Sequence, residues 1–353
     1  MSYDYHIGVD YHKAYSHIVV QDTGGKTLRS GRVRNDRRSL AGFLSPFAAN
    51  AHAVLEATRN WTVMFDWLDE LCDEVVLAHP LKVKAIADAK IKTDKIDATI
   101  LSHLLRADLI PAAHAPSLRA REARSALRER MFYVRLRTMV KNRIVTLFDR
   151  YPEERAKLKP LTDLFGTAGR KQLAEVAVSE LDRIQVDRSL ALIGDLNTRI
   201  KESEATIKAQ SKGNANVRRL KTLPGIGEFF ARLIDAEIDD IGRFRSAGKL
   251  AAYAGLVPST YSSGGKTFHG RIIKQGNKWL RWAFVEAVAP AVATDPDLKA
   301  YYERLKATKG TNPAKVATAR RLLTIAFQLL RDGRSYERRG ARPEGRSQQS
   351  RLS

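Results

Sequence analysis

Hydrophobic and polar positions alternate differently along successive parts of the chain. In roughly the first 110 residues, short apolar runs bounded by turn residues predict strands at 6–10, 16–21, 28–34, 53–58 and 74–80. Apolar residues at helical spacing predict helices after the Asn35-Asp36 cap, over Trp61–Leu71 and over 92–110. This order predicts an α/β domain over residues 1–112.

From residue 113 onward, apolar residues recur only at the spacing that is typical of helices. Residues 113–215 carry two long stretches with apolar positions at helical spacing, separated by Pro152 and Pro160. They predict a helical, partly coiled-coil arm, which either dimerises the protein or spaces two other domains. Residues 216–332 predict a mostly helical third domain. Residues 333–353 are rich in arginine and poor in apolar residues, which predicts a disordered basic tail.

The charge balance adds a partner to this outline. The 353 residues include 61 Lys+Arg against 39 Asp+Glu, a formal net charge of +22. An excess of this size, spread along the whole chain, predicts a polyanionic partner, and nucleic acid is the leading candidate. The alternative is a charge that serves solubility alone.

Cysteine and hydropathy indicate the compartment. The chain has one cysteine, Cys72, which excludes an internal disulfide and predicts a reducing environment. No apolar run reaches the length of a membrane span, and the N-terminus lacks the apolar core of a signal peptide. We therefore expect a cytoplasmic, nucleoid-associated protein.

Four carboxylates in the first domain suggest chemistry. Asp10 and Glu56 end predicted strands, whereas Asp94 and Asp97 lie three residues apart at the start of a predicted helix, on one of its faces. Carboxylates gathered in one cleft repel one another unless divalent cations neutralise them, and Mg²⁺ or Mn²⁺ suits oxygen ligands. The four acids therefore predict a metal site for phosphoryl transfer. Alternatively, the helical pair only complements the helix dipole. His12 and His79 are assigned no role.

Two glycine-containing segments stand out in the third domain. Leu223-Pro-Gly-Ile-Gly227 lies between apolar helical stretches, the pattern of a helix-hairpin-helix, whose Gly225 and Gly227 would allow backbone contact with a DNA phosphate. Further on, residues 261–266 read YSSGGK, which predicts a flexible polar turn. A serine in such a turn is either a turn residue or a nucleophile, and the segment alone does not decide between them.

Basic residues flank both candidate sites. We predict that they contact nucleic-acid phosphates. The residues are Lys92 and Lys95 near the acids, and Lys266, Arg271, Lys274 and Lys278 after the serines.

Considered together, these motifs resemble a known family. Asp10 in GVDYHK, Glu56 in LEAT, and Asp94 and Asp97 in KTDKIDA resemble the tetrad of the DEDD-type insertion-sequence transposases. The first domain of that family is similar to the Holliday-junction resolvase RuvC and is ribonuclease-H-like. The segments LPGIG, LAAYAGLVP, SSGGK and GRIIKQGNKWLR resemble its second, transposase-specific domain, in the same order.

The resemblance implies a recombinase whose two domains build one composite active site. It implies a serine nucleophile, which falls at Ser263 here, with Ser262 as the alternative. It also implies a noncoding bridge RNA that pairs with donor and target DNA. Strand exchange needs several active sites, which favours a homodimer or homotetramer.

Two other functions remain open at this stage. One is a RuvC-like metal-dependent nuclease, in which water attacks and the serine segment only binds DNA. The other is a non-catalytic nucleic-acid-binding protein, in which the carboxylates have no catalytic role.

Overall fold

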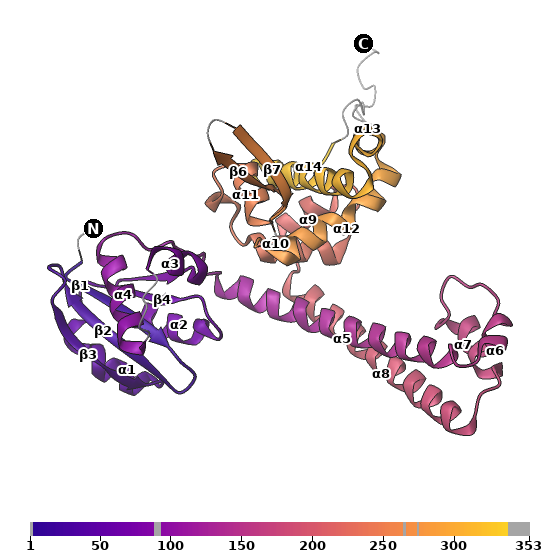
Figure 1. Cartoon of the computed structure of the whole chain (residues 1–353), viewed down its shortest axis with the longest axis horizontal. Helices are drawn as coiled ribbons and strands as arrows, with labels where there is room; N and C mark the ends of the chain where they lie inside the picture. The colour runs from indigo at the N-terminus through magenta and orange to yellow at the C-terminus, as the bar shows by residue number, and fades with distance from the viewer. Residues whose placement is uncertain (1–2, 88–92, 264–265, 274, 338–353) are drawn as a thin grey trace, which may run out of the picture. The chain divides into compact units, whose positions relative to one another are not determined.

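A computed structural model describes residues 3–87, 93–263, 266–273 and 275–337, without the side chains of 260–263, 266, 267, 269 and 271. The chain divides into two compact units, Met1–Pro116 and Ser117–Ser353 (Figure 1). The predicted arm and the predicted third domain thus fall within one unit. Among the described residues, no helix is both long enough and apolar enough to cross a membrane.

The described residues of the first unit form a five-stranded mixed sheet in the order β3-β2-β1-β4-β5. β1 pairs antiparallel with β2 and parallel with β4, and β4 pairs parallel with β5. The strands are β1 Tyr5–Tyr11, β2 Tyr15–Asp22, β3 Thr27–Arg34, β4 Ala51–Glu56 and β5 Glu74–Ala78. This confirms the predicted strands, except that the last one ends before Pro80, which begins a helix.

Helices cover both faces of this sheet. Ile7, Val9 and Leu55 pack with the apolar residues of α1 and α2 on one face. Val54 and Ala78 pack with α3 and α4 on the other, as expected when successive strand residues point to opposite faces. The helices are α1 Arg37–Leu44, η1 Ser45–Phe47, α2 Trp61–Leu71, α3 Pro80–Ile86 and α4 Asp94–Arg106. This mixed sheet with helices on both faces is compatible with the expected ribonuclease-H-like order.

Two helices of 31 residues each dominate the first part of the second unit, α5 Leu118–Phe148 and α8 Glu180–Gln210. They lie side by side (Figure 1), and Arg130 pairs with Glu204 while Arg150 pairs with Asp182, so they run antiparallel. Buried residues of α8 recur every seven positions, the spacing with which one helix packs along another: Val186, Ile193, Ile200 and Ile207. Much of the stripe that suggested dimerisation is therefore buried within the chain itself.

Short helices close the far end of this pair, and the remaining elements form a helical core with a β-ribbon. The described elements are α6 Pro152–Ala156, α7 Thr167–Glu175, α9 Ala215–Lys221, α10 Glu228–Ile238, η2 Ile241–Arg243, α11 Ala247–Tyr253, β6 Pro258–Ser263, β7 Lys266–Ile272, α12 Lys278–Thr294, α13 Pro296–Lys309 and α14 Thr311–Asp332. Leu127 of α5 belongs to the same apolar core as α9–α12 and α14. Of the predicted basic tail, residues 338–353 lie outside the described residues.

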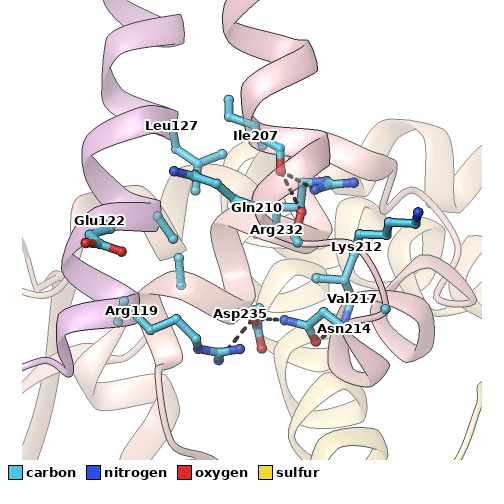
Figure 2. Close-up of a pocket in the computed structure, with 15 residues that line it drawn as sticks. Arg119, Glu122, Leu127, Ile207, Gln210, Lys212, Asn214, Val217, Arg232 and Asp235 are labelled. Atoms are coloured by element: carbon cyan, nitrogen blue, oxygen red, sulfur yellow. Dashed lines mark hydrogen bonds and ion pairs between the residues drawn. The ribbon is translucent and has the colours of Figure 1, made fainter.

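A cavity of about 400 Å³ lies where α5 and α8 meet α9 and α10. In Figure 2, Arg119 and Asn214 point toward Asp235, and Arg232 points toward the carbonyl of Ile207. Arg232 also pairs with Glu228 on its own helix. The charged side chains around the cavity form ion pairs and hydrogen bonds with other groups of the protein. We therefore interpret the cavity as part of the packing between the long helices and the C-terminal helices.

Candidate active site

The carboxyl ends of two parallel strands bring the first pair of predicted acids together. Val9 of β1 pairs with Leu55 of β4, so the next residues along the two strands, Asp10 and Glu56, are neighbours at the same edge of the sheet. The apolar residues before them are buried on both faces. The strands are therefore fixed by the core, and the carboxylates emerge where the core ends.

Helix α4 brings the second pair to the same place, and a glycine makes its approach possible. A Cβ on Gly8 would overlap the backbone of α4 at Ala98 and Ser102. The Ser102 hydroxyl donates to the carbonyl of His6 at 2.9 Å, which ties the helix to β1. At the start of α4, the side chain of Thr93 caps the helix that carries Asp94 and Asp97.

The structure adds a histidine that the sequence interpretation left without a role. His12 Nε2 lies 3.0 Å from Asp10 Oδ2 and 3.4 Å from Asp94 Oδ1. The Tyr15 hydroxyl donates to Asp94 Oδ2 at 3.0 Å. Asp10, His12 and Asp94 each offer an atom within 4.8 Å of the others, a spacing that can hold a metal ion. The available signal was that His12 follows Asp10 by two residues at the end of a strand.

Asp10 also belongs to a second group. A cavity of about 230 Å³ in the first unit is lined by residues that include Asp10, Glu56 and Asp97, together with Lys84 of α3. Asp10 thus contacts His12 on one side and shares this cavity with Glu56 and Asp97 on another. The four predicted acids gather around one strand end.

The electrostatics of this region favour a bound cation. Burial raises the pKa of the Asp10 carboxyl, His12 opposes that shift, and the neighbouring charges of Asp94 and Asp97 add to it. The hydrogen bond from Tyr15 lowers the pKa of Asp94, which keeps this carboxyl ionised. A divalent ion would relieve the cost of ionising Asp10 beside other acids, so the donor set fits the implied metal.

The two candidate nucleophiles lie in a β-ribbon, which corrects the prediction of a flexible turn. Ser262 and Ser263 end β6, and Ser263 pairs with Lys266 of β7. Aromatic and β-branched residues on both sides of Gly264-Gly265 favour strand pairing. These two glycines lie outside the described residues, as do Lys92 and Lys274.

Close backbone contacts fix the base of this ribbon. A Cβ on Gly276 would overlap the backbone of Gly255, and the backbone N–H of Asn277 donates to the carbonyl of Tyr253 at 2.7 Å. The Asn277 side chain caps α12 and donates to Glu237 Oε2 at 2.8 Å. Glu237 is 1% exposed. The sequence interpretation missed this carboxylate because an acid inside a helical pattern resembles a surface residue.

The buried Glu237 also anchors the ribbon base to the long helix α5. Its carboxylate pairs with Arg128 at 3.0 Å and with Arg124 at 3.4 Å. Both arginines belong to α5, whereas Asn277 begins α12. One buried group therefore joins three helices below the ribbon.

The glycines of the predicted helix-hairpin-helix have different surroundings. Helices α9 and α10 flank the turn, and Gly225 has φ of 79°. A Cβ there would overlap the backbone of α12, so internal packing already requires this glycine. A Cβ on Gly227 would meet no atom within 4 Å. A phosphate contact at either one stays a prediction, as do contacts at the exposed Lys95 and Lys278, and at Lys266 and Arg271.

Family models match both parts of the chain. Residues 7–152 match the model DEDD_Tnp_IS110, described as a transposase. Residues 217–303 match the model described as the transposase IS116/IS110/IS902 family. The first match contains all four carboxylates, and the second contains the ribbon.

Individual relatives agree with these models. A transposase for insertion sequence element IS1328 from Yersinia enterocolitica is 27% identical over 94% of this chain and 98% of its own length. A transposase for element IS1111A from Coxiella burnetii is 26% identical over 94% of this chain and 90% of its own length. An uncharacterized 43.6 kDa protein of insertion element IS110 from Streptomyces coelicolor is 28% identical over 205 residues, and the match spans half of that relative. The two family models and the relatives matched along nearly the whole chain support the assignment of this protein as a DEDD transposase of the IS110/IS116 family.

Proposed function

We propose that this protein moves an insertion sequence by cutting and rejoining DNA strands through a phosphoserine on Ser263. The carboxylates Asp10, Glu56, Asp94 and Asp97 would hold the divalent ions that the reaction needs. The observation that carries the proposal is the position of Asp10, which is shared by a group with His12 and Asp94 and by a cavity with Glu56 and Asp97.

The acids prepare the phosphate for attack. When bound, Mg²⁺ or Mn²⁺ would neutralise charge on the scissile phosphate and stabilise the charge that develops during attack. Asp10 and Glu56 are fixed by β1 and β4, and Asp94 is oriented by Tyr15. Side chains held in this way lose little entropy when substrate binds.

The serine carries the covalent step. The Ser263 hydroxyl loses its proton as its oxygen attacks phosphorus, and the bond from phosphorus to the 3′ oxygen breaks. The 3′ oxygen takes up a proton and leaves as a hydroxyl, while the 5′ phosphate stays on the serine. A 3′ hydroxyl from another strand then attacks this ester and returns the serine to its starting state. The energy of the phosphodiester is conserved, so no nucleotide cofactor is consumed.

The partners follow from charge and from this chemistry. A net charge of +22 suits donor DNA, target DNA and a bridge RNA. Joining four strand ends needs more than one serine, so we propose a homodimer or homotetramer. Exposed apolar residues on the long helices, Phe132, Met139 and Leu192, suit contacts between copies.

The second candidate is a metal-dependent nuclease in which water, rather than serine, attacks. The acidic cluster alone suits that reaction equally well. The two functions differ in one product, because only the serine reaction leaves protein covalently attached to DNA.

The decisive experiment looks for that product. The full chain is incubated with Mg²⁺, with the proposed bridge RNA and with DNA that carries the element's ends. The DNA is labelled at the 3′ end of the cut strand, and the products are resolved on a denaturing gel. We expect a labelled protein band that Ser263→Ala reduces by at least about 10³-fold. Ser262→Ala is the matched control and keeps the band. Asp10→Asn and excess chelator also remove it.

Three results would contradict parts of this scheme. Cleavage without any covalent band would favour the nuclease. A band that disappears in Ser262→Ala but not in Ser263→Ala would move the nucleophile by one residue. Full activity in chelator would reject the metal role of the acids.

A further inference from the structure

The surroundings of Asp10 contain two chemically different sets of donors. Toward β2, its neighbours are the imidazole of His12 and the carboxylate of Asp94. Toward α3 and the rest of α4, the cavity offers the carboxylates of Glu56 and Asp97. One set contains a nitrogen, whereas the acids of the other contain oxygen alone.

His12 is fixed in place by its own backbone. Its amide donates to Tyr15 O at 3.1 Å, and its carbonyl accepts from Asn35 Nδ2 at 2.7 Å. Asn35 is held in turn by the hydroxyl of Ser16 at 2.7 Å. The imidazole packs against the ring of Tyr15, with ring centroids 5.1 Å apart.

This arrangement orients the imidazole before any metal arrives. A loop residue with a free side chain would lose conformational entropy on binding an ion, and His12 avoids much of this loss. The hydroxyl of the same Tyr15 donates to Asp94. A single aromatic residue therefore positions both neighbours of Asp10 in this set.

Imidazole nitrogen distinguishes between metals. Mg²⁺ prefers oxygen ligands and keeps its waters, whereas Zn²⁺ binds imidazole readily. Mn²⁺ also suits oxygen ligands, but it accepts an imidazole nitrogen more readily than Mg²⁺ does. We propose that the residues around Asp10 hold two ions and that His12 Nε2 is a ligand of one of them, so that the two positions on either side of Asp10 differ in their metal preference. The position with His12 and Asp94 takes a nitrogen-binding ion, and the position with Glu56 and Asp97 takes a hard ion such as Mg²⁺. This inference rests on the proposed function only in assuming that Asp10 binds metal.

The rival explanation is that His12 is merely a hydrogen-bond partner of the two carboxylates. In that case the imidazole would leave when a divalent ion binds. The rival thus predicts no bond between metal and nitrogen.

Pulsed electron paramagnetic resonance of Mn²⁺ tests the proposal directly. Untagged full-length protein is loaded with substoichiometric Mn²⁺ in a buffer without nitrogen ligands. We expect modulation from a directly bound ¹⁴N nucleus in the wild type, its loss in His12→Gln, and a Mn²⁺ affinity about 10-fold to 100-fold lower in that variant. Mg²⁺ affinity, measured by calorimetry, should change less.

His17 offers the matched control. It lies opposite Asp10 in the β1–β2 pair, but its Nε2 is 3.1 Å from the hydroxyl of Ser30. His17→Gln should therefore keep the nitrogen signal, and its loss in this variant instead would overturn the assignment to His12. The wild-type spectrum does not depend on how any variant folds, and a wild type without nitrogen coupling rejects the proposal.

The same experiment separates this inference from the proposed function. If Mn²⁺ binding requires Asp10 but shows no nitrogen coupling, only the role of His12 is wrong. If Asp10→Asn binds Mn²⁺ as the wild type does, the metal centre itself is wrong.

Discussion

The carboxylates of the first unit and the serines of the second are positioned by different means. Asp10 and Glu56 end strands that are buried on both faces, and α4 presses its own pair of acids against the same sheet. Ser262 and Ser263 instead lie in a ribbon that is fixed at its base, around Gly255, Gly276 and Asn277. The proposed metal ligands must match a small ion, whereas the proposed nucleophile must meet a large and variable substrate. The comparison teaches that the positions of the acids are set by packing in the core. The positions of the serines are set by a ribbon that is anchored at one end.

Breaking the packing of the first unit should have the largest effect. Gly8→Ala places a Cβ against the backbone of α4, so we expect the free energy of unfolding to fall by about 1–3 kcal/mol. Displacement of Asp94 and Asp97 should also lower metal affinity by about 10-fold or more. Denaturant titration and calorimetry with Mn²⁺ measure the two effects.

Gly42 provides the matched control, since a Cβ there has no neighbour within 4 Å and the residue lies inside α1. Gly42→Ala should leave stability equal or slightly higher, because alanine is the better helix former. Equal behaviour of Gly8→Ala and Gly42→Ala would show that α4 does not depend on Gly8.

Loosening the ribbon base should have an intermediate effect. Asn277→Ala removes the cap of α12 and one partner of the buried Glu237, so we expect a stability loss of about 1–2 kcal/mol. If the position of Ser263 depends on the anchored end of the ribbon, formation of the covalent adduct should also slow by about 10-fold or more. Single-turnover kinetics on the denaturing gel give the rate.

Asn214→Ala is the comparison that isolates position from stability. Asn214 also caps a helix, α9, and donates to a buried carboxylate, Asp235, at 2.7 Å (Figure 2). It lies at the helical joint rather than beneath the ribbon. We expect a similar loss of stability with an unchanged rate of adduct formation, and equal slowing in both variants would remove the special role of Asn277.

The prediction that disturbs the protein least concerns Cys72, which lies in the first unit and needs no substitution. Burial raises the pKa of its thiol to about 12, so almost no thiolate exists at pH 8. Iodoacetamide should therefore modify native Cys72 about 10³-fold more slowly than an unfolded thiol with a pKa near 9. Mass spectrometry across a denaturant series then reports unfolding of the first unit by itself. Rapid labelling of the native protein would contradict the tight packing of this region.

Much of the first unit was predictable because its patterns are local. Period-2 and period-3.6 positions located the strands and most helices, and acids at strand ends suggested where chemistry lies. The helix α3 was missed because its seven residues offer too short a pattern. The ribbon was read as a turn because adjacent glycines and serines outweighed the strand-forming residues beside them.

The contacts of His12, Glu237 and Gly225 were not predictable for a different reason. Each depends on which distant segment packs against it: His12 on Asp94 of α4, Glu237 on Asn277 at the start of α12, and Gly225 on the backbone of α12. A glycine that admits a helix and a glycine that admits a phosphate look alike in a sequence.

The sequence by itself determined the alternation that forms the sheet, the seven-residue spacing of apolar residues in α8 and the basic charge. It also determined that Asp10 and Glu56 end strands and that Asp94 and Asp97 begin a helix. Only the tertiary structure decided that Asp10 is shared between two groups, that His12 joins one of them, and that Glu237 is buried beneath the ribbon. Periodicity is a property of neighbours along the chain, whereas a site is made by groups that share a volume. Strand register and close helix packing determine which groups share that volume. Neither can be predicted from a single segment of the sequence.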